Sequence, residues 1–518
     1  MAARGAGQRP PATLVVPAVA AALLALLPLG YLVVRAGDKG AGFAFDYLRR
    51  DSTSELVLRS LGLTVTVTVA CVVLGVGLAV VTTRIVLPGR ALWMTLAALP
   101  LAIPSYVSAY AWISALPSLA GFGGAALVLT ACTYPYVYLP AAAALSRTDP
   151  ALEEVARSLG RTPWQTFRTV TLRQIRPAVA SGALLVALYV LSDFGAVSLM
   201  RFDAFTQVIY TSYRASFDRT PAAVLSLVLV VITIAITLGE VRSRGRAQQW
   251  RAGAGAARRP VPQALSRGRT SATLGGCVAV ALVSLGVPLA SLGYWTVRGA
   301  SLDLDWSRLA GAGATTIVAS GAGALGCVVL AVPVGVLAAR YRSTGVRMIE
   351  QATFAGHALP GIVVALALIF FGTRYARPFY LEMPMVIAAY VVLFLPAAVG
   401  AVRASVALSS PRVEEVARSL GRSPYGVLRT VTLPLAAPGV AAGAALVMLT
   451  CMKELPATLL LHPTGSETLA IRLWSLTRVG SYADAAPYAA ALVLLAALPT
   501  FWLSHASHQR PDSGEPAP

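Results

Sequence analysis

Long apolar runs constrain this chain more than any other feature of its sequence. Runs of about 18 or more residues, each long enough to cross a hydrocarbon core roughly 30 Å thick, recur from end to end. The first run is too long for the apolar part of a cleaved signal peptide, so we interpret it as a retained span. We therefore expect an all-α polytopic membrane protein of about twelve transmembrane helices. The predicted spans are roughly 12–35, 60–83, 91–115, 122–145, 175–199, 220–239, 271–297, 312–339, 350–371, 380–402, 435–460 and 484–505.

The placement of charge gives these spans a direction. Charged residues make up 12% of the chain, and the net charge of +20 comes mainly from arginine. The arginines gather at the N-terminus and in every loop that follows an even-numbered span, which is the pattern of cytoplasmic loops. Both termini are therefore predicted to be cytoplasmic, and we do not expect nucleic acid as a partner. The clusters are Arg4/Arg9, Arg84/Arg90, Arg147–Arg176, Arg242–Arg269, Arg340–Arg347 and Arg403–Arg429.

The chain contains an internal repeat. The strings "CVVL" and "LPAA" each return after 256 residues, and beyond a short insertion the offset becomes 261. An even number of spans in each half gives two parallel six-helix repeats, related by an axis along the membrane normal. We predict a first repeat at 1–239, a cytoplasmic Arg-rich linker at 240–270, a second repeat at 271–507 and a disordered tail at 508–518.

One charged stretch is duplicated more faithfully than the spans around it. "EEVARSLGR" occurs at Glu153–Arg161 and at Glu414–Arg422, and the extended copies match at 17 of 27 positions. Because the surrounding spans have diverged further, something restrains this loop in particular. An amphipathic hairpin lying on lipid is the alternative, but two near-identical copies favour a site for a protein partner.

The residues around each copy predict a helix–turn–helix. An N-cap followed by proline starts a short helix at Asp149-Pro150 and at Ser410-Pro411. Gly160 and Gly421 are expected to close these helices in the left-handed conformation. The pairs Thr162-Pro163 and Ser423-Pro424 then start a second short helix.

Both loops resemble the "EAA" coupling loop of binding-protein-dependent ABC transporter permeases. The family pattern is Glu-x-Ala-x-x-x-Gly, then nine residues, then an aliphatic residue followed by x-Leu-Pro. Arg173 stands where the first copy should have Pro, and Val155 and Val416 replace the first Ala. The matching residues are Glu154, Ala156, Gly160, Val170 and Leu172 in the first copy, and Glu415, Ala417, Gly421, Val431, Leu433 and Pro434 in the second.

The resemblance implies that each loop, including Glu153 and Glu414 beside the motif, docks into an ATPase subunit and transmits its closure. The chain is not expected to be an enzyme, because a phosphate-binding loop needs Gly-Lys-Ser/Thr and the two lysines are Lys39 and Lys453 in other contexts. No cofactor is expected on this chain. The implied partners are two ATP-binding cassette subunits, an extracytoplasmic solute-binding protein and the lipid bilayer, in the bacterial cytoplasmic (inner) membrane.

Two acids occupy equivalent places within apolar segments. Asp193 and Glu454 each lie 16 residues past a repeat proline, roughly 24 Å along a helix. An ionised group at that depth needs water or a partner, so we interpret the pair as lining a translocation pathway. Gly195 and Pro456 would break the two helices there. The alternatives are neutralisation of Glu454 by Lys453, or acids that end the spans among outer headgroups.

The segments around these acids resemble the iron(III)-type branch of the permeases, whose two halves are fused in one chain. The resemblance covers about residues 55–505 and implies ferric iron as cargo, which suits carboxylate chemistry. Permeases for thiamine, phosphonate, polyamine or sulfate share the architecture and remain alternatives. An ion-coupled secondary transporter that uses Asp193 and Glu454 as cation sites is the alternative from another class. We assign no residues to a metal site.

Overall fold

The computed structural model describes residues 10–215, 218–243, 262–299 and 305–508. Every named element in these ranges is a helix, apart from a single β-bridge between Ile85 and Gln263. The fold is therefore all-helical, as the apolar runs predict. Residues 244–261 of the predicted linker and 509–518 of the predicted tail lie outside the described residues.

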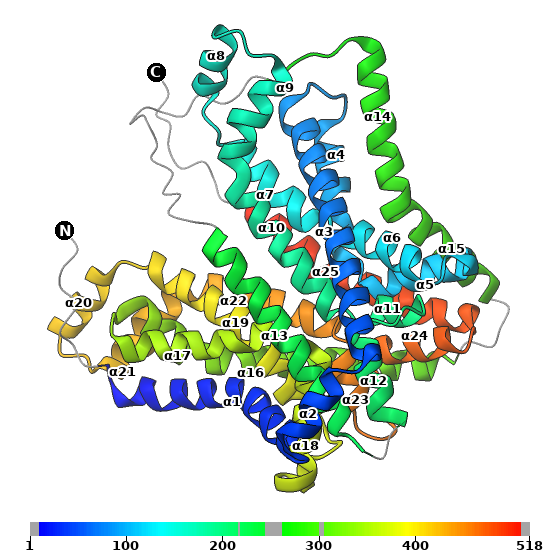
Figure 1. The fold of residues 1–518 in the computed structure, drawn as a ribbon. Coiled ribbons are helices and arrows are strands. Elements are labelled where there is room, and N and C mark those ends of the chain that lie inside the picture. The colour runs from blue at the N-terminus through cyan, green and yellow to red at the C-terminus, as the bar shows by residue number, and fades with distance from the viewer. Residues whose placement is uncertain (1–9, 216–217, 244–261, 300–304, 509–518) are drawn as a thin grey trace.

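The helices before the linker run from α1 to α13 (Figure 1). They are α1 (Ala12–Gly37), α2 (Gly40–Leu48), α3 (Asp51–Arg84), α4 (Arg90–Ala98), η1 (Leu99–Ala102), α5 (Ser105–Ala115), η2 (Pro117–Leu119), α6 (Phe122–Thr133), α7 (Pro135–Leu145), α8 (Pro150–Ser158), α9 (Pro163–Thr166), η3 (Phe167–Thr171), α10 (Leu172–Ser192), α11 (Gly195–Leu199), α12 (Phe205–Ala215) and α13 (Thr220–Ser243).

The helices after the linker follow a matching order. They are α14 (Arg267–Ala281), η4 (Leu282–Gly286), α15 (Val287–Gly299), α16 (Trp306–Arg340), α17 (Thr344–Phe354), η5 (Ala355–Ala358), α18 (Gly361–Tyr375), η6 (Arg377–Phe379), α19 (Met383–Leu408), α20 (Pro411–Ser419), α21 (Pro424–Val427), η7 (Leu428–Thr432), α22 (Leu433–Met452), α23 (Pro456–Leu461), α24 (Leu469–Arg478) and α25 (Tyr482–His508).

Nine helices in the described part of the chain are long and apolar enough to cross a membrane. A tenth span is formed if α4–η1 and α5, which meet at a bend of 94°, are counted together. The spans predicted at 91–115 and 350–371 are thus not straight helices. Pro104 and Pro360 explain the breaks, since the residue before a proline is driven out of the helical region, and Ile103 and Leu359 are both extended.

The predicted spans at 175–199 and 435–460 also end earlier than their apolar runs. The long helix α10 stops at Ser192 and α22 stops at Met452, and each is followed by a short separate helix. The breaks fall at Asp193 and Glu454. The sequence stays apolar on both sides of each break. Hydropathy therefore predicted the C-terminal ends of these two spans several residues too late.

Each half is organised around three helices, and the first helices cross between halves. Helices α3, α7 and α10 pack on one another, as do α16, α19 and α22. The helix α1 packs on α16, α17 and α18, while α15 packs on α5 and α14 contacts α4. Figure 1 shows α1 alongside α16 and α17, and α14 on the side of α3 and α4. The two halves therefore share one interlocked core.

Candidate functional site

Each repeated loop begins with a short helix. In the first copy, the carboxylate of Asp149 caps α8 by accepting the backbone N–H of Ala151 at 3.0 Å. The predicted side-chain cap at Ser410 is wrong, because Ser410 precedes α20 but its hydroxyl makes no cap hydrogen bond. Pro411 still starts α20, since its fixed φ already suits the first helical turn.

Glycine ends both short helices, as predicted. Gly160 has φ +80° and Gly421 has φ +82°, in the left-handed region that strains other residues. The following N–H of Arg161 donates to the carbonyl of Ala156 at 3.1 Å, and that of Arg422 donates to Ala417 at 3.2 Å. These bonds satisfy the last carbonyls of each helix and turn the chain sharply back.

The second predicted helix starts as expected but is not separate. Thr162 and Gln165 form a reciprocal capping box at the start of α9, and the Ser423 hydroxyl accepts the N–H of Gly426 at 3.1 Å. A π-turn, η3 or η7, then joins each short helix to the long helix that follows. The helix–turn–helix therefore runs directly into the membrane-spanning part of each half.

Arg173 and Pro434 occupy the same exposed position in the turn after the π-turn. The backbone has the same course in both copies, although one has Pro and the other has Arg. The departure from the family pattern at Arg173 therefore leaves the local fold unchanged and places a positive charge on the surface of the first loop.

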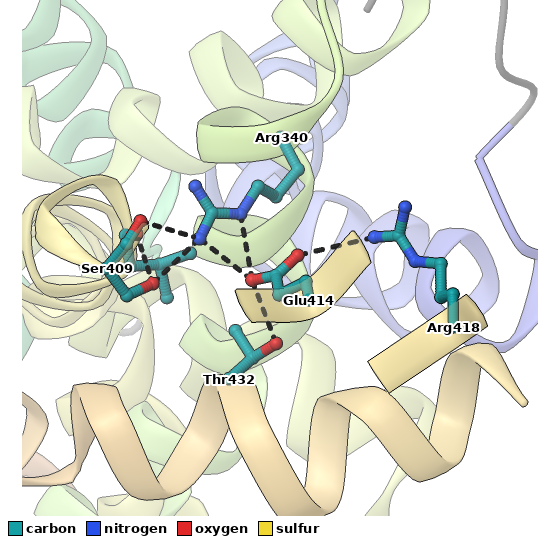
Figure 2. A network of polar contacts seen from close by, with 6 residues as sticks. Arg340, Ser409, Glu414, Arg418 and Thr432 are labelled. Atoms are coloured by element: carbon teal, nitrogen blue, oxygen red, sulfur yellow. Dashed lines mark hydrogen bonds and ion pairs between the residues drawn. The ribbon is translucent and has the colours of Figure 1, made fainter. Parts of the chain in front are cut away.

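An ion pair anchors the second loop to the end of a long helix. Arg340, in the last turn of α16, places Nη2 2.8 Å from Oε1 of Glu414 (Figure 2). The same Glu414 oxygen accepts the hydroxyl of Thr432 at 3.0 Å, and its other oxygen accepts from Arg418 at 3.3 Å. Arg340 also donates to the hydroxyl of Ser409 at 2.7 Å. This network joins α16, α20 and η7.

The first loop repeats this network with equivalent residues. Arg84 Nη2 lies 2.9 Å from Oε1 of Glu153, and that oxygen accepts the hydroxyl of Thr171 at 2.8 Å. Arg84 also donates to the hydroxyl of Thr148 at 2.5 Å. All four side chains of the two ion pairs are mostly buried, with exposed fractions between 5% and 17%. Each pair is therefore shielded from solvent and supported by further hydrogen bonds.

The opposite face of each short helix is exposed and carries large apolar side chains among charged ones. Leu159 and Leu420 are 75% and 77% exposed, and Glu154 and Glu415 also face solvent. Three further exposed positions are the same in both copies, at the same offset of 261. They are Leu152, Val155 and Trp164 in the first loop and Val413, Val416 and Tyr425 in the second.

The predicted loop residues thus divide into two groups. Glu153, Glu414, Ala156 and Ala417 face the protein, and Leu172 and Leu433 are half-buried where the long helices begin. Glu154, Glu415, Gly160, Gly421 and Pro434 are exposed. Sequence reasoning missed the arginine partners. The available signal was the repeat itself, which places Arg84 and Arg340 at the same distance after "CVVL".

The two acids in apolar segments cap short helices. Asp193 Oδ1 accepts the backbone N–H groups of Ala196 at 2.9 Å and Val197 at 3.3 Å. Glu454 Oε1 accepts the N–H of Ala457 at 3.0 Å. The predicted break residues Gly195 and Pro456 are the first residues of α11 and α23.

The space around each acid is matched to its length. Ser105, the first residue of α5, donates its hydroxyl to Oδ2 of Asp193. The equivalent residue in α18 is Gly361, where an added Cβ would collide with Oε1 of Glu454. The first half thus pairs a serine with the shorter acid, aspartate. The second half pairs a glycine with the longer acid, glutamate. Lys453 does not pair with Glu454 here, and its ammonium donates to the carbonyl of Leu101 at 3.3 Å.

Comparison with known proteins relates this chain to inner membrane components of transport systems. A family model described as the inner membrane component of binding-protein-dependent transport systems matches residues 71–239 and 331–510. Fe(3+)-transport system permease protein FbpB 2 of Haemophilus influenzae is 39% identical over 498 residues, which cover 96% of this chain and 98% of the relative.

Other relatives match shorter parts. The putative 2-aminoethylphosphonate transport system permease protein PhnV of Salmonella typhimurium is 34% identical over 27% of this chain and 53% of its own length. The sulfate transport system permease protein CysW of Escherichia coli is 27% identical over 40% of this chain and 80% of its own length.

Proposed function

Because this chain belongs to the family of binding-protein-dependent transport system inner membrane components, we propose that it is the permease of an ABC importer for ferric iron. A solute-binding protein delivers the cargo on the outer side, and two separate ATPase subunits bind ATP. Both termini face the cytoplasm of a bacterial inner membrane. About twelve spans form two parallel six-helix halves, and the broken segments α4–α5 and α17–α18 count among these spans.

The two repeated loops carry this proposal. Each presents the same exposed face, with a large aliphatic residue at Leu159 or Leu420 and a carboxylate at Glu154 or Glu415. Exposed apolar patches of this kind mark interaction surfaces. Two equal faces on two parallel halves fit two equal partners, one under each loop.

The buried ion pairs provide the mechanical connection. A push on α8 reaches α3 through Glu153 and Arg84, and reaches α10 through Thr171. In the second half, Glu414 joins α20 to α16 and to η7. A packed and bonded element moves as a rigid body rather than yielding, so closure of the ATPases turns the long helices against each other.

The near-full-length relative supports iron as the cargo. That protein is named as an Fe(3+)-transport system permease, and the match covers 96% of this chain. The phosphonate and sulfate relatives match 27% and 40% of the chain. An ion-coupled transporter has less support, because Asp193 and Glu454 already accept helix N–H groups and the duplicated loops would have no role.

The test is reconstitution of the permease with its ATPase and binding protein in proteoliposomes. We expect ATP-dependent uptake of radioactive ferric iron, and no uptake of sulfate or 2-aminoethylphosphonate. The double substitution Leu159→Asp with Leu420→Asp should abolish ATPase co-purification while leaving the permease folded. Val479→Asp is the control, since Val479 is equally exposed but lies between α24 and α25. Uptake without ATP, or normal uptake by the double variant, would overturn the proposal.

A further inference from the structure

Helices α12 and α24 occupy equivalent places in the two halves. Each follows the short helix beyond the broken span, and each is held at its first residue by a hydroxyl on the long helix of its own half. The N–H of Phe205 donates to Ser60 at 3.1 Å, and the N–H of Leu469 donates to Thr316 at 3.0 Å. Ser60 and Thr316 are themselves 256 residues apart, which is the repeat offset.

Tyr210 and Trp474 are the sixth residues of these two helices, so they are equivalent positions. Their ring centroids are 5.8 Å apart and their planes meet at 84°. Equivalent residues from two halves related by a rotation axis can touch only beside that axis. Since the axis of two parallel repeats runs along the membrane normal, these rings lie where a pathway shared by both halves must pass.

A third ring completes the cluster. Phe194 directly follows the acid Asp193, and its centroid lies 5.1 Å from that of Tyr210 and 5.8 Å from that of Trp474. All three side chains are buried, with exposed fractions of 1%, 8% and 5%. Two rings come from the first half and one from the second, so the cluster spans the boundary between the halves.

Polar contacts fix the position of the indole. The Nε1–H of Trp474 donates to the hydroxyl of Ser198 in α11 at 3.2 Å. Asp193 caps that same short helix, and Ser105 of α5 donates to Asp193. The carboxylate in the first half is therefore a positioning residue, acting on a ring of the second half through α11.

We propose that Phe194, Tyr210 and Trp474 form an aromatic gate that closes the translocation pathway on its outer side. This inference rests on the proposed function. The assignment of the gate to the outer side rests on the proposed orientation, in which α10 and α22 run outward before their breaks. Three rings packed in tilted and T-shaped pairs present mainly apolar surface, with the indole N–H already bonded to Ser198, and an apolar constriction of this kind blocks ions and solutes. Opening requires the two halves to separate, which draws Trp474 away from Ser198 and the two first-half rings.

Cross-linking across the axis tests the gate in the assembled transporter. The pair Tyr210→Cys with Trp474→Cys is treated with thiol-specific bifunctional methanethiosulfonates of increasing length, at rest and with ATP and vanadate. The native cysteines are buried and free, so the unsubstituted chain and the two single variants serve as controls. We expect efficient bridging at rest by the shorter reagents, and bridging reduced by at least about tenfold in the vanadate-trapped state.

Function after bridging gives the second measurement. Bridged transporters should lose iron uptake and recover it when the reagent is released by a reducing agent. Equal bridging in both states, or undiminished uptake when bridged, would overturn the gate and leave static packing in its place. Failure of the proposed function can be told apart from failure of the gate. In that case the unsubstituted chain would show no ATP-dependent iron uptake before any reagent is added.

Single-ring variants guard against a failure to fold. Trp474→Phe keeps an apolar ring but loses the hydrogen bond to Ser198, and we expect it to retain the ATPase and to transport. Trp474→Ala opens the constriction, so it should retain the ATPase yet show ATP hydrolysis that no longer depends on the binding protein. Trp306→Ala is the matched control, since Trp306 is 72% exposed at the start of α16. Binding-protein dependence that is intact in Trp474→Ala would contradict the gate.

Discussion

Arg340 and Glu414 are 74 residues apart in the chain, yet they form a buried ion pair 2.8 Å long. The pair joins the last turn of the longest helix to the first turn of a short surface helix. The equivalent pair, Arg84 and Glu153, makes the same connection in the first half. These contacts decide how firmly each loop is attached to the membrane-spanning core.

Removal of one member of the pair should release the loop. Glu414→Ala leaves the guanidinium of Arg340 largely buried beside the hydroxyl of Ser409, and loss of one partner of a buried ion pair costs about 3–5 kcal/mol. We expect faster amide hydrogen exchange over 411–422 and a lower melting temperature. Glu415→Ala is the control, since the neighbouring Glu415 is exposed. Equal effects from the two substitutions would show that the ion pair is not the anchor.

Substitution of the turn glycines should weaken both loops. Gly160→Ala and Gly421→Ala force alanine into a left-handed conformation, at a cost of about 1 kcal/mol or more. We expect weaker ATPase co-purification, with asparagine at either position better tolerated than alanine. Gly400→Ala, within α19 and with open space around it, should have no such effect. If all three alanine variants retain the ATPase equally well, the turns do not need glycine.

The acids and their neighbours should be exchangeable as pairs. Gly361→Ser alone should destabilise the permease, because its side chain collides with Glu454. Adding Glu454→Asp shortens the acid and recreates the arrangement of Ser105 with Asp193, so the double variant should recover thermal stability and uptake. The reciprocal swap, Ser105→Gly with Asp193→Glu, should behave alike. Strictly additive losses in these double-mutant cycles would contradict size matching.

The linker should support the first loop but not the second. The N–H of Gln263 donates to the carbonyl of Arg84 at 2.8 Å, and its side-chain oxygen, turned toward Arg157, lies 2.9 Å from both terminal nitrogens. Gln263→Pro removes the backbone donor, so we expect faster amide exchange over 150–161. The second loop, at 411–422, serves as the internal control. Gln263→Ala should have the smaller effect, and equal acceleration of both loops would refute the local role.

The sequence predicted the loops well because their structure is local. Caps, prolines and left-handed glycines lie within a few residues of the helices that they bound, and the repeat exposed their special status. The ion pairs were not predicted, since Arg340 meets Glu414 only when α16 and α20 are brought together. The direct continuation of the short helix at Pro163 through η3 into α10 was also not predicted, because a π-turn leaves no clear pattern of residues.

The broken spans show where hydropathy fails. A run of apolar residues reports solvent, not backbone continuity, so the span bounds 175–199 and 435–460 ran past the ends of α10 and α22, although breaks at Gly195 and Pro456 were predicted from those residues. Their capping role depends on N–H groups three residues onward and, at Asp193, on a serine 88 residues away. The contact between Tyr210 and Trp474 was not predicted either. An insertion between the broken spans and helices α12 and α24 shifts the repeat offset from 261 to 264, so the two residues do not align at the earlier offset.

The exchange of first helices has a consequence for synthesis. Helix α1 packs on α13 of its own half and on α16, α17 and α18 of the second half, the first of which begins about 270 residues after α1 ends. At about 5–20 residues per second, the ribosome reaches that surface roughly 15–50 s after α1 has emerged. In the meantime α1 is apolar enough to remain in lipid, with a mean hydropathy of 2.3. During synthesis the first inserted helix can therefore pack on α13 of its own half, but the larger part of its packing surface is absent until the second half is made.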